Sequence, residues 1–209
     1  MDLDQALHNR HSCKRYTTKR VGWKKLHAIL TAGRLAPSAG NLQPWRFIVI
    51  TNQKTKSEIA GCCLKQYWLT EAPVLIFVCA DSANIKRHFG VRGELYTIQS
   101  CSAAIENMLL KATDLGLGSC WVGAFDETSV KRVLNIPDEI RPQAVLSIGY
   151  PDEKPEPKQR FPVELVTYYE EYGNTKNDKS FFPLEKHPPK IKEETKRSLS
   201  GLFKRKRKS

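Results

Sequence analysis

The sequence predicts a layered domain of the α+β or α/β class, in which helices cover both faces of one sheet. Helical periodicities alternate along the chain with four short apolar stretches, as expected for helices packed on a sheet. Residues 73–80, PVLIFVCA, are continuously apolar, which is typical of a strand covered on both faces. With 209 residues, 40% of them hydrophobic, the chain can bury one core of this kind.

Five elements are expected in the first half of the chain. Residues 2–10 have a short helical pattern, and residues 23–35 place their apolar side chains on one stripe at helical spacing. Residues 45–51 have the composition of a strand. Residues 53–65 suit a helix with a polar outer face, and residues 73–80 are the strand expected at the centre of the sheet.

The second half begins with the longest helical pattern, residues 94–115, whose apolar residues on more than one side indicate burial against several elements. The glycines of the following DLGLGS are expected to end this helix. A short strand, SCWVGAF, comes next, and Asp126 can cap a helix over residues 127–134. Residues 143–151 form the last expected strand.

The positive charge is concentrated at the C-terminus. The whole chain has a net charge of +12, and residues 174–209 hold 12 Lys or Arg against 4 Asp or Glu, a net +8. The closing LFKRKRKS could bind nucleic acid through its phosphates, act as an import-like address, or be a solvated tail. We expect a basic C-terminal extension over residues 174–209, largely flexible because Pro, Lys, Glu and Ser dominate it.

Several classes of protein and site are not supported. No apolar run reaches eighteen residues, and the N-terminus lacks the apolar segment of a secretory signal, so we expect a cytoplasmic protein. The six cysteines have neither C-x-x-C spacing nor histidines at zinc-finger distances, and no metal site is predicted. Neither a Rossmann glycine motif nor a P-loop is present.

Two short basic clusters are candidates for binding an anion. In NRHSCKRY, Arg10, Ser12 and Lys14 alternate, and alternation in an extended segment turns all three toward one side. In KQRFP, Lys158 and Arg160 alternate in the same way before a proline. Either cluster could be a solvated surface turn, but both together could converge on one anion.

The stretch APSAGNLQPW, residues 36–45, precedes an expected strand with unusually many turn-forming residues. The prolines fix φ, and Gly40 permits a tight turn. Ser38, Asn41 and Gln43 supply donors and acceptors, which could serve either their own turn or a ligand.

Five stretches of the chain resemble successive signatures of the FMN-dependent nitroreductase family. They occur in the family's order with similar gaps, and the similarity covers about residues 1–173. The stretches are RHSCK (10–14), LAPSAGNLQPWRFIVI (35–50), ATDLGLGSCWVGAFDE (112–127), LNIPDEIRPQAVLSIGYPDE (134–153) and KQRFP (158–162).

The resemblance implies a three-layer α+β fold, with a central, mostly antiparallel sheet flanked by helices. It also implies an intertwined homodimer with FMN at the subunit interface. The residues that would bind FMN are Arg10, His11, Ser12, Lys14, Pro37, Ser38, Ala39, Asn41, Val122, Gly123, Ala124, Lys158 and Arg160. Of these, Ser38 and Asn41 would reach the flavin of the partner subunit. Some relatives have a glutamate where Gly123 aligns, so only a backbone donor is expected there.

The activity that the resemblance implies is oxidoreductase chemistry in two steps. NAD(P)H would pass a hydride to flavin N5, and an electron-poor acceptor such as a nitroaromatic or a quinone would then receive the electrons. No catalytic side chain is required, because the cofactor carries the chemistry. The alternatives are reductive dehalogenation or flavin chemistry on the same fold, and a nucleic-acid-associated protein that acts through its basic tail.

Overall fold

The computed structural model describes residues 1–153 and 159–175. The chain divides into two compact units, Met1–Glu156 and Pro157–Ser209. In the second unit, the described residues form the short 3-10 helix η4 (Val163–Leu165), and the rings of Tyr168 and Tyr172 lie 4.6 Å apart. Apart from residues 174 and 175, the basic extension lies outside the described residues.

One four-stranded sheet forms the centre of the first unit, with the strand order β1-β2-β4-β3. Each described pair of neighbours is antiparallel. The strands are β1 (Trp45–Ile50), β2 (Val74–Asp81), β3 (Gly118–Val122) and β4 (Ile140–Gly149). The expected α+β class is therefore confirmed, and the α/β alternative is wrong because α/β folds are built on parallel strands.

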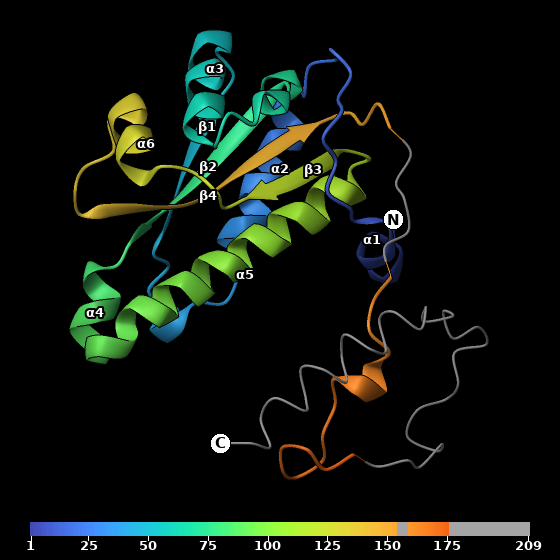
Figure 1. The fold of residues 1–209 in the computed structure, drawn as a ribbon, viewed down its shortest axis with the longest axis vertical. Helices are drawn as coiled ribbons and strands as arrows, with labels where there is room; N and C mark the ends of the chain where they lie inside the picture. The colour runs from blue at the N-terminus through green and yellow to red at the C-terminus, as the bar shows by residue number, and fades with distance from the viewer. Residues whose placement is uncertain (154–158, 176–209) are drawn as a thin grey trace, which may run out of the picture. The chain divides into compact units, whose positions relative to one another are not determined.

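Helices cover both faces of this sheet (Figure 1). On one face, α2 (Trp23–Arg34) and α5 (Gly93–Asp114) pack over one apolar cluster. On the other face, α3 (Gln53–Cys62) and α6 (Glu127–Leu134) pack over a second cluster.

Strand β2 contributes to both clusters, since Ile76 faces the first and Phe77 the second. Both side chains are fully buried. This two-sided burial is the reason that residues 73–80 are continuously apolar, as the sequence predicts.

Three of the expected boundaries are wrong by three residues. Helix α3 ends at Cys62, short of residue 65, because Leu64 and Lys65 have φ angles of 55° and 59°, which a right-handed helix cannot contain. Strand β3 ends at Val122, where its pairing with β4 stops, and does not include the rest of SCWVGAF. Strand β4 begins at Ile140, before the expected residue 143, and Pro142 lies beside the shift of register between Val78 and Cys79, where a proline is tolerated.

The remaining elements are short. Helix α1 (Leu3–Asn9) is capped by Asp2, which accepts a hydrogen bond from the Gln5 N–H, and α1 contacts α5. Helix α4 (Ala83–Phe89) and the 3-10 helices η1 (Ala39–Asn41), η2 (Tyr67–Glu71) and η3 (Gly90–Arg92) are not expected from the sequence. In α4 only Ile85 is buried, so the segment has no apolar periodicity to detect. Among the described helices, none has the length and apolarity that a membrane crossing requires.

Candidate functional site

The segment after α1 extends the sheet at the edge formed by β3. The Cys13 N–H donates to the Ser119 carbonyl at 3.0 Å, and Ser12 forms a parallel bridge with Ser119. Farther along, the Thr17 N–H donates to the Tyr150 carbonyl at 2.9 Å. Residues 10–17 are therefore fixed by backbone hydrogen bonds to the edge strand and to the residues that follow β4.

Two glycines allow this segment to approach the sheet closely. A Cβ atom on Gly118 would lie 2.7 Å from Cys13 Sγ, and one on Gly149 would lie 2.7 Å from the Tyr16 ring. Both distances are shorter than side-chain atoms tolerate, so only glycine fits without displacement. The Tyr16 hydroxyl then donates to the Cys13 carbonyl at 2.6 Å and lies 2.7 Å from Ser147 Oγ.

Exposure along the segment agrees with the expected alternation. Ser12 and Lys14 are exposed on either side of Cys13, which is completely buried. The Arg10 side chain is 22% exposed, and its Nε lies 3.7 Å from a Glu106 carboxylate oxygen on α5. Ser12 and Lys14 therefore share an outer side, opposite the buried Cys13 thiol, and Arg10, the third alternating residue, lies partly buried against α5.

Lys14 lies against an aromatic ring of the same chain. Its Nζ is 5.5 Å from the centre of the Trp68 ring, in η2, a distance at which a cation and a ring attract each other. Buried Lys56 holds η2 by donating to the carbonyls of Thr70 at 3.2 Å and Ala72 at 2.7 Å. Burial lowers the pKa of Lys56. The ring that supports Lys14 is thus tied to the core.

The polar turn before β1 is held largely by its own side chains. Ser38 Oγ accepts a hydrogen bond from the Gln43 N–H at 3.0 Å, so Ser38 serves the turn itself. The Ala39 N–H donates to Ser100 Oγ on α5 at 3.2 Å. Gly40 and Asn41 both have a φ angle of 56°, a left-handed conformation that glycine and asparagine tolerate best.

Different parts of α5 hold the two predicted groups of site residues. The turn bonds to Ser100, whereas Arg10 approaches Glu106, about 9 Å farther along the helix axis. Pro37 and Asn41 are exposed, and Ala39 is half-buried. Because the structure is of one protomer, the contact of Ser38 and Asn41 with a partner's flavin stays a prediction.

The chain leaves the sheet at Gly123 and Ala124, which are both exposed, after buried Val122. A Cβ atom on Gly123 would meet no atom closer than Trp121 Nε1 at 4.0 Å. Asp126 then caps α6, and the hydrogen bond from the Ser129 hydroxyl lowers the Asp126 pKa. The end of β3 therefore presents backbone with little side-chain cover.

The described residues do not test the last predicted pair, Lys158 and Arg160. Lys158 lies outside them, and Arg160 is an exposed residue of the second unit. Their role in binding a phosphate stays a prediction.

Burial makes several thiols unreactive. It raises the pKa of Cys13, Cys63, Cys79 and Cys101 to about 12. Since the thiolate is the nucleophile, these four thiols are poor nucleophiles at neutral pH unless a bound cation displaces the proton. None of the six cysteines, all of which lie within residues 1–153, forms a disulfide.

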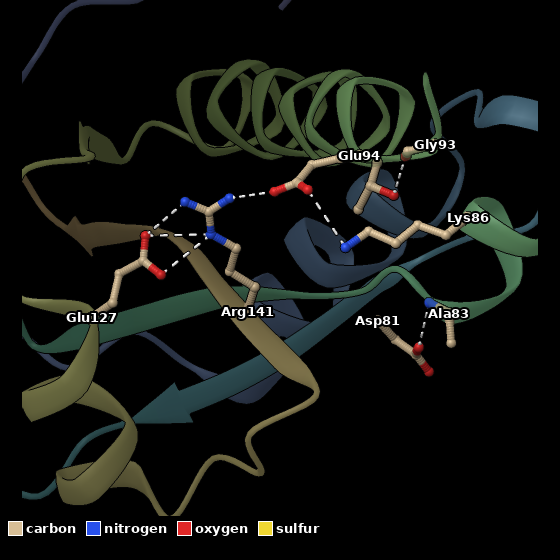
Figure 2. A network of polar contacts seen from close by, with 8 residues as sticks. Asp81, Ala83, Lys86, Gly93, Glu94, Glu127 and Arg141 are labelled. Carbon is tan, nitrogen blue, oxygen red and sulfur yellow. Dashed lines mark hydrogen bonds and ion pairs between the residues drawn. The ribbon is translucent and has the colours of Figure 1, made fainter. Parts of the chain in front are cut away.

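A charged cavity that the sequence does not predict lies where β4 begins, between α5 and α6. Its volume is about 300 Å³, and Figure 2 shows Arg141 reaching both helices. The Arg141 guanidinium lies 2.7 Å from Glu94 and 3.0 Å from Glu127, and the hydrogen bonds to Glu127 raise its pKa. Lys86 adds an ion pair with Glu94 at 3.5 Å. The network joins α4, α5, α6 and β4.

Replacing Arg141 with glutamine is expected to change the free energy of unfolding by less than about 1 kcal/mol. The side chains of Arg141, Glu94 and Glu127 are 45–50% exposed, so water screens their ion pairs. Urea unfolding measures the effect. The matched control is Lys86→Gln, which removes the longer ion pair with Glu94. A decrease of several kcal/mol in the free energy of unfolding would contradict this and would mean that the fold depends on the network.

A model of the nitroreductase family matches residues 7–67 and 60–150, which is most of the chain. The chain belongs to the nitroreductase family. Among related sequences, the nitroreductase-family chain is 31% identical over 197 residues to an NADH dehydrogenase of Thermus thermophilus, covering 81% of this chain and 96% of the relative. It is 27% identical over 187 residues to an FMN reductase [NAD(P)H] of Bacillus subtilis, covering 83% of this chain and 75% of the relative.

A solved structure agrees with this assignment. The crystal structure of a nitroreductase family protein from Streptococcus pneumoniae superposes with a TM-score of 0.72 at 27% identity, covering 80% of this chain and 100% of that one. The nitroreductase fold that the resemblance implies is therefore confirmed. The edge segment at residues 10–17 and the end of β3 both lie within the matched residues.

Proposed function

We propose that this nitroreductase-family protein is an FMN-dependent oxidoreductase, which transfers electrons from NADH or NADPH to an electron-poor acceptor such as a nitroaromatic or a quinone. The observation that carries the proposal is the outer side of residues 10–14. It places Arg10, Ser12 and Lys14 at the edge of β3, the strand that leads to exposed Gly123 and Ala124. The relative named FMN reductase [NAD(P)H] supports the choice of cofactor and reductant.

The donors available on this side fit the chemistry of FMN. Its phosphate is an anion, for which a guanidinium offers two parallel hydrogen bonds and a hydroxyl offers another. The edges of its flavin ring can accept and donate hydrogen bonds. The backbone can approach such a ring closely where side chains are small, as at Gly123 after β3. When bound, FMN supplies the hydride chemistry.

The chain's own residues would bind and orient the cofactor. Arg10 would hold the phosphate, and Ser12 would donate to it or to the ribityl chain. Lys14, supported by Trp68, would place a positive charge at the pyrimidine edge, where it stabilises developing negative charge. The backbone N–H groups of Gly123 and Ala124 would donate to the central ring.

We further propose that two copies of the chain complete the site as a homodimer. On α5, Leu95 and Ile98 are 46% and 39% exposed, and the polar turn is bonded to Ser100 on the same helix. A second copy of the chain would cover this exposed apolar face of α5. Ser38 and Asn41 would then reach the cofactor across the interface.

The proposal predicts that the purified full chain retains one FMN per protomer after saturation and desalting, with the native mass of a dimer. NADH or NADPH added without oxygen should bleach the yellow absorption, and a nitroaromatic or a quinone should restore it. Absorption spectra with each nucleotide and acceptor measure this. A preparation that stays colourless after FMN is added, and that binds DNA in a salt-dependent way, would contradict the proposal and favour nucleic-acid binding through the tail.

A further inference from the structure

The inner side of the same edge segment gathers three groups that can bind a metal ion. One ring nitrogen of His11, the sulfur of Cys13 and a carboxylate oxygen of Glu153 all lie within 4.8 Å of one another. His11 and Cys13 come from the segment after α1, and Glu153 comes from the residues that follow β4. The cluster therefore joins two parts of the chain that are far apart in sequence.

The hydrogen bonding of His11 leaves one of its ring nitrogens without a partner. Its Nδ1 lies 3.0 Å from the Asn9 carbonyl oxygen, and this oxygen can only accept, so Nδ1 bears the proton. The lone pair is then on Nε2, which is buried and has no hydrogen-bond partner among the described residues. Metal-binding histidines commonly use their other nitrogen in this way, to donate to a carbonyl. A buried nitrogen with no partner is otherwise destabilising.

The other two groups are held in place by backbone contacts. Cys13 is completely buried, and its N–H donates to the Ser119 carbonyl. The Glu153 carboxylate accepts a hydrogen bond from the Lys14 N–H at 2.8 Å and also contacts the Cys13 thiol and the Arg15 N–H, so a metal ion would take the place of the thiol proton between Cys13 and Glu153. The Asp152 N–H donates to the Arg15 carbonyl at 3.0 Å. These bonds fix the residues on both sides of the cluster before any ligand binds.

We propose that His11, Cys13 and Glu153 bind one Zn²⁺ ion through imidazole nitrogen, sulfur and carboxylate oxygen, with water in the fourth position. A mixed set of nitrogen, sulfur and oxygen donors suits zinc better than magnesium or calcium, which prefer oxygen alone. Donors around tetrahedral zinc lie about 3.5 Å apart, so the three groups need to move together by little more than an ångström. The Cys13 thiol proton leaves to solvent as the sulfur–zinc bond forms, and nothing is oxidised or reduced.

A zinc ion here would clamp residues 10–14 to the residues after β4 from the inner side. The outer side, with Arg10, Ser12 and Lys14, would stay available to a ligand, whereas His11, which the resemblance counts among the FMN-binding residues, would bind the metal instead. The clamp does not depend on the proposed flavin activity, because zinc binding can be measured in protein without flavin. Failure of one proposal therefore leaves the other standing.

The test uses the full chain, first stripped of metal with a chelator and then titrated with zinc. We expect one zinc per chain after desalting, by elemental analysis, and Co²⁺ in place of zinc should give the absorption of a cobalt–thiolate bond. Glu153→Gln preserves the acceptor for Lys14 but removes the charge, and should weaken zinc binding at least about tenfold. Cys13→Ser should abolish the cobalt–thiolate absorption.

The matched control is Cys62→Ser, which removes a half-buried thiol on α3 and should change neither the zinc content nor the cobalt spectrum. Circular dichroism checks that each variant is folded, and zinc should raise the melting temperature of the unaltered protein but not of Glu153→Gln. The proposal is overturned if the unaltered protein retains no zinc. Unchanged affinity in folded Glu153→Gln, or a cobalt signal lost in Cys62→Ser and kept in Cys13→Ser, also overturns it.

Discussion

Replacing Arg10 with alanine is expected to weaken FMN binding about 10- to 100-fold, the effect of losing charge-assisted hydrogen bonds to a phosphate. Titration of the flavin fluorescence measures the dissociation constant. Riboflavin is the same molecule without the phosphate, so its affinity should be nearly the same in both proteins. This comparison separates a lost phosphate contact from general damage to the site.

The same substitution should change the free energy of unfolding by less than about 1 kcal/mol, because the contact of Arg10 with Glu106 is long, at 3.7 Å, and the Glu106 side chain is 46% exposed. Arg20→Ala is a matched control, since it removes the same charge from an exposed position farther along the chain. If Arg10→Ala keeps full FMN occupancy after long dialysis, or loses riboflavin as strongly as FMN, the assignment of the phosphate to Arg10 is wrong.

The centre of the fold could be predicted because the residues of its central strand are apolar one after another. The unbroken apolar stretch around Ile76 and Phe77 indicates a strand covered on both faces. The structure places these two side chains in different clusters, on opposite faces of the sheet. Strand direction could not be predicted in the same way. Periodicity records which side chain faces which way, but not whether a neighbouring strand runs parallel or antiparallel.

The candidate site was only partly predictable for a related reason. Alternation within residues 10–14 depends on local geometry, and the exposure of Ser12 and Lys14 beside buried Cys13 agrees with it. The pairing of Ser12 with Ser119, and the approach of Glu153 to Cys13, join distant parts of the chain. A histidine and a cysteine two residues apart are too weak a signal for a metal site without that third donor.

The glycines of DLGLGS show how one motif can have two physical causes. Gly116 follows α5 with a φ angle of 71°, as expected of a glycine that ends a helix. Gly118 instead begins β3 and is required by the closeness of Cys13. The close contact between Gly118 and Cys13 cannot be predicted from the residues around Gly118, because it joins two distant parts of the chain.

Replacing Gly118 with valine is therefore expected to destabilise the protein by about 1–3 kcal/mol, the usual effect of adding atoms to a well-packed site. Its Cβ atom alone would lie 2.7 Å from Cys13 Sγ and 3.3 Å from Pro151. Because the Cys13 N–H is bonded to β3, relief of the overlap must push the edge segment outward. FMN affinity should fall together with stability, since Arg10, Ser12 and Lys14 move with the segment.

Urea unfolding and FMN titration measure the two effects, and Gly61→Val is the matched control. Gly61 is on α3 with no atom within 4 Å of an added Cβ, and valine favours a helix slightly more than glycine does, so this variant should be as stable as the unaltered protein or more so. Cys13→Ala should recover only part of the loss in Gly118→Val, because it removes the sulfur at 2.7 Å but keeps the Cys13 Cβ atom at 2.8 Å. If the losses instead add independently, the overlap with the Cys13 sulfur is not what requires glycine at the start of β3, and if Gly118→Val keeps full stability, no overlap with Cys13 requires it.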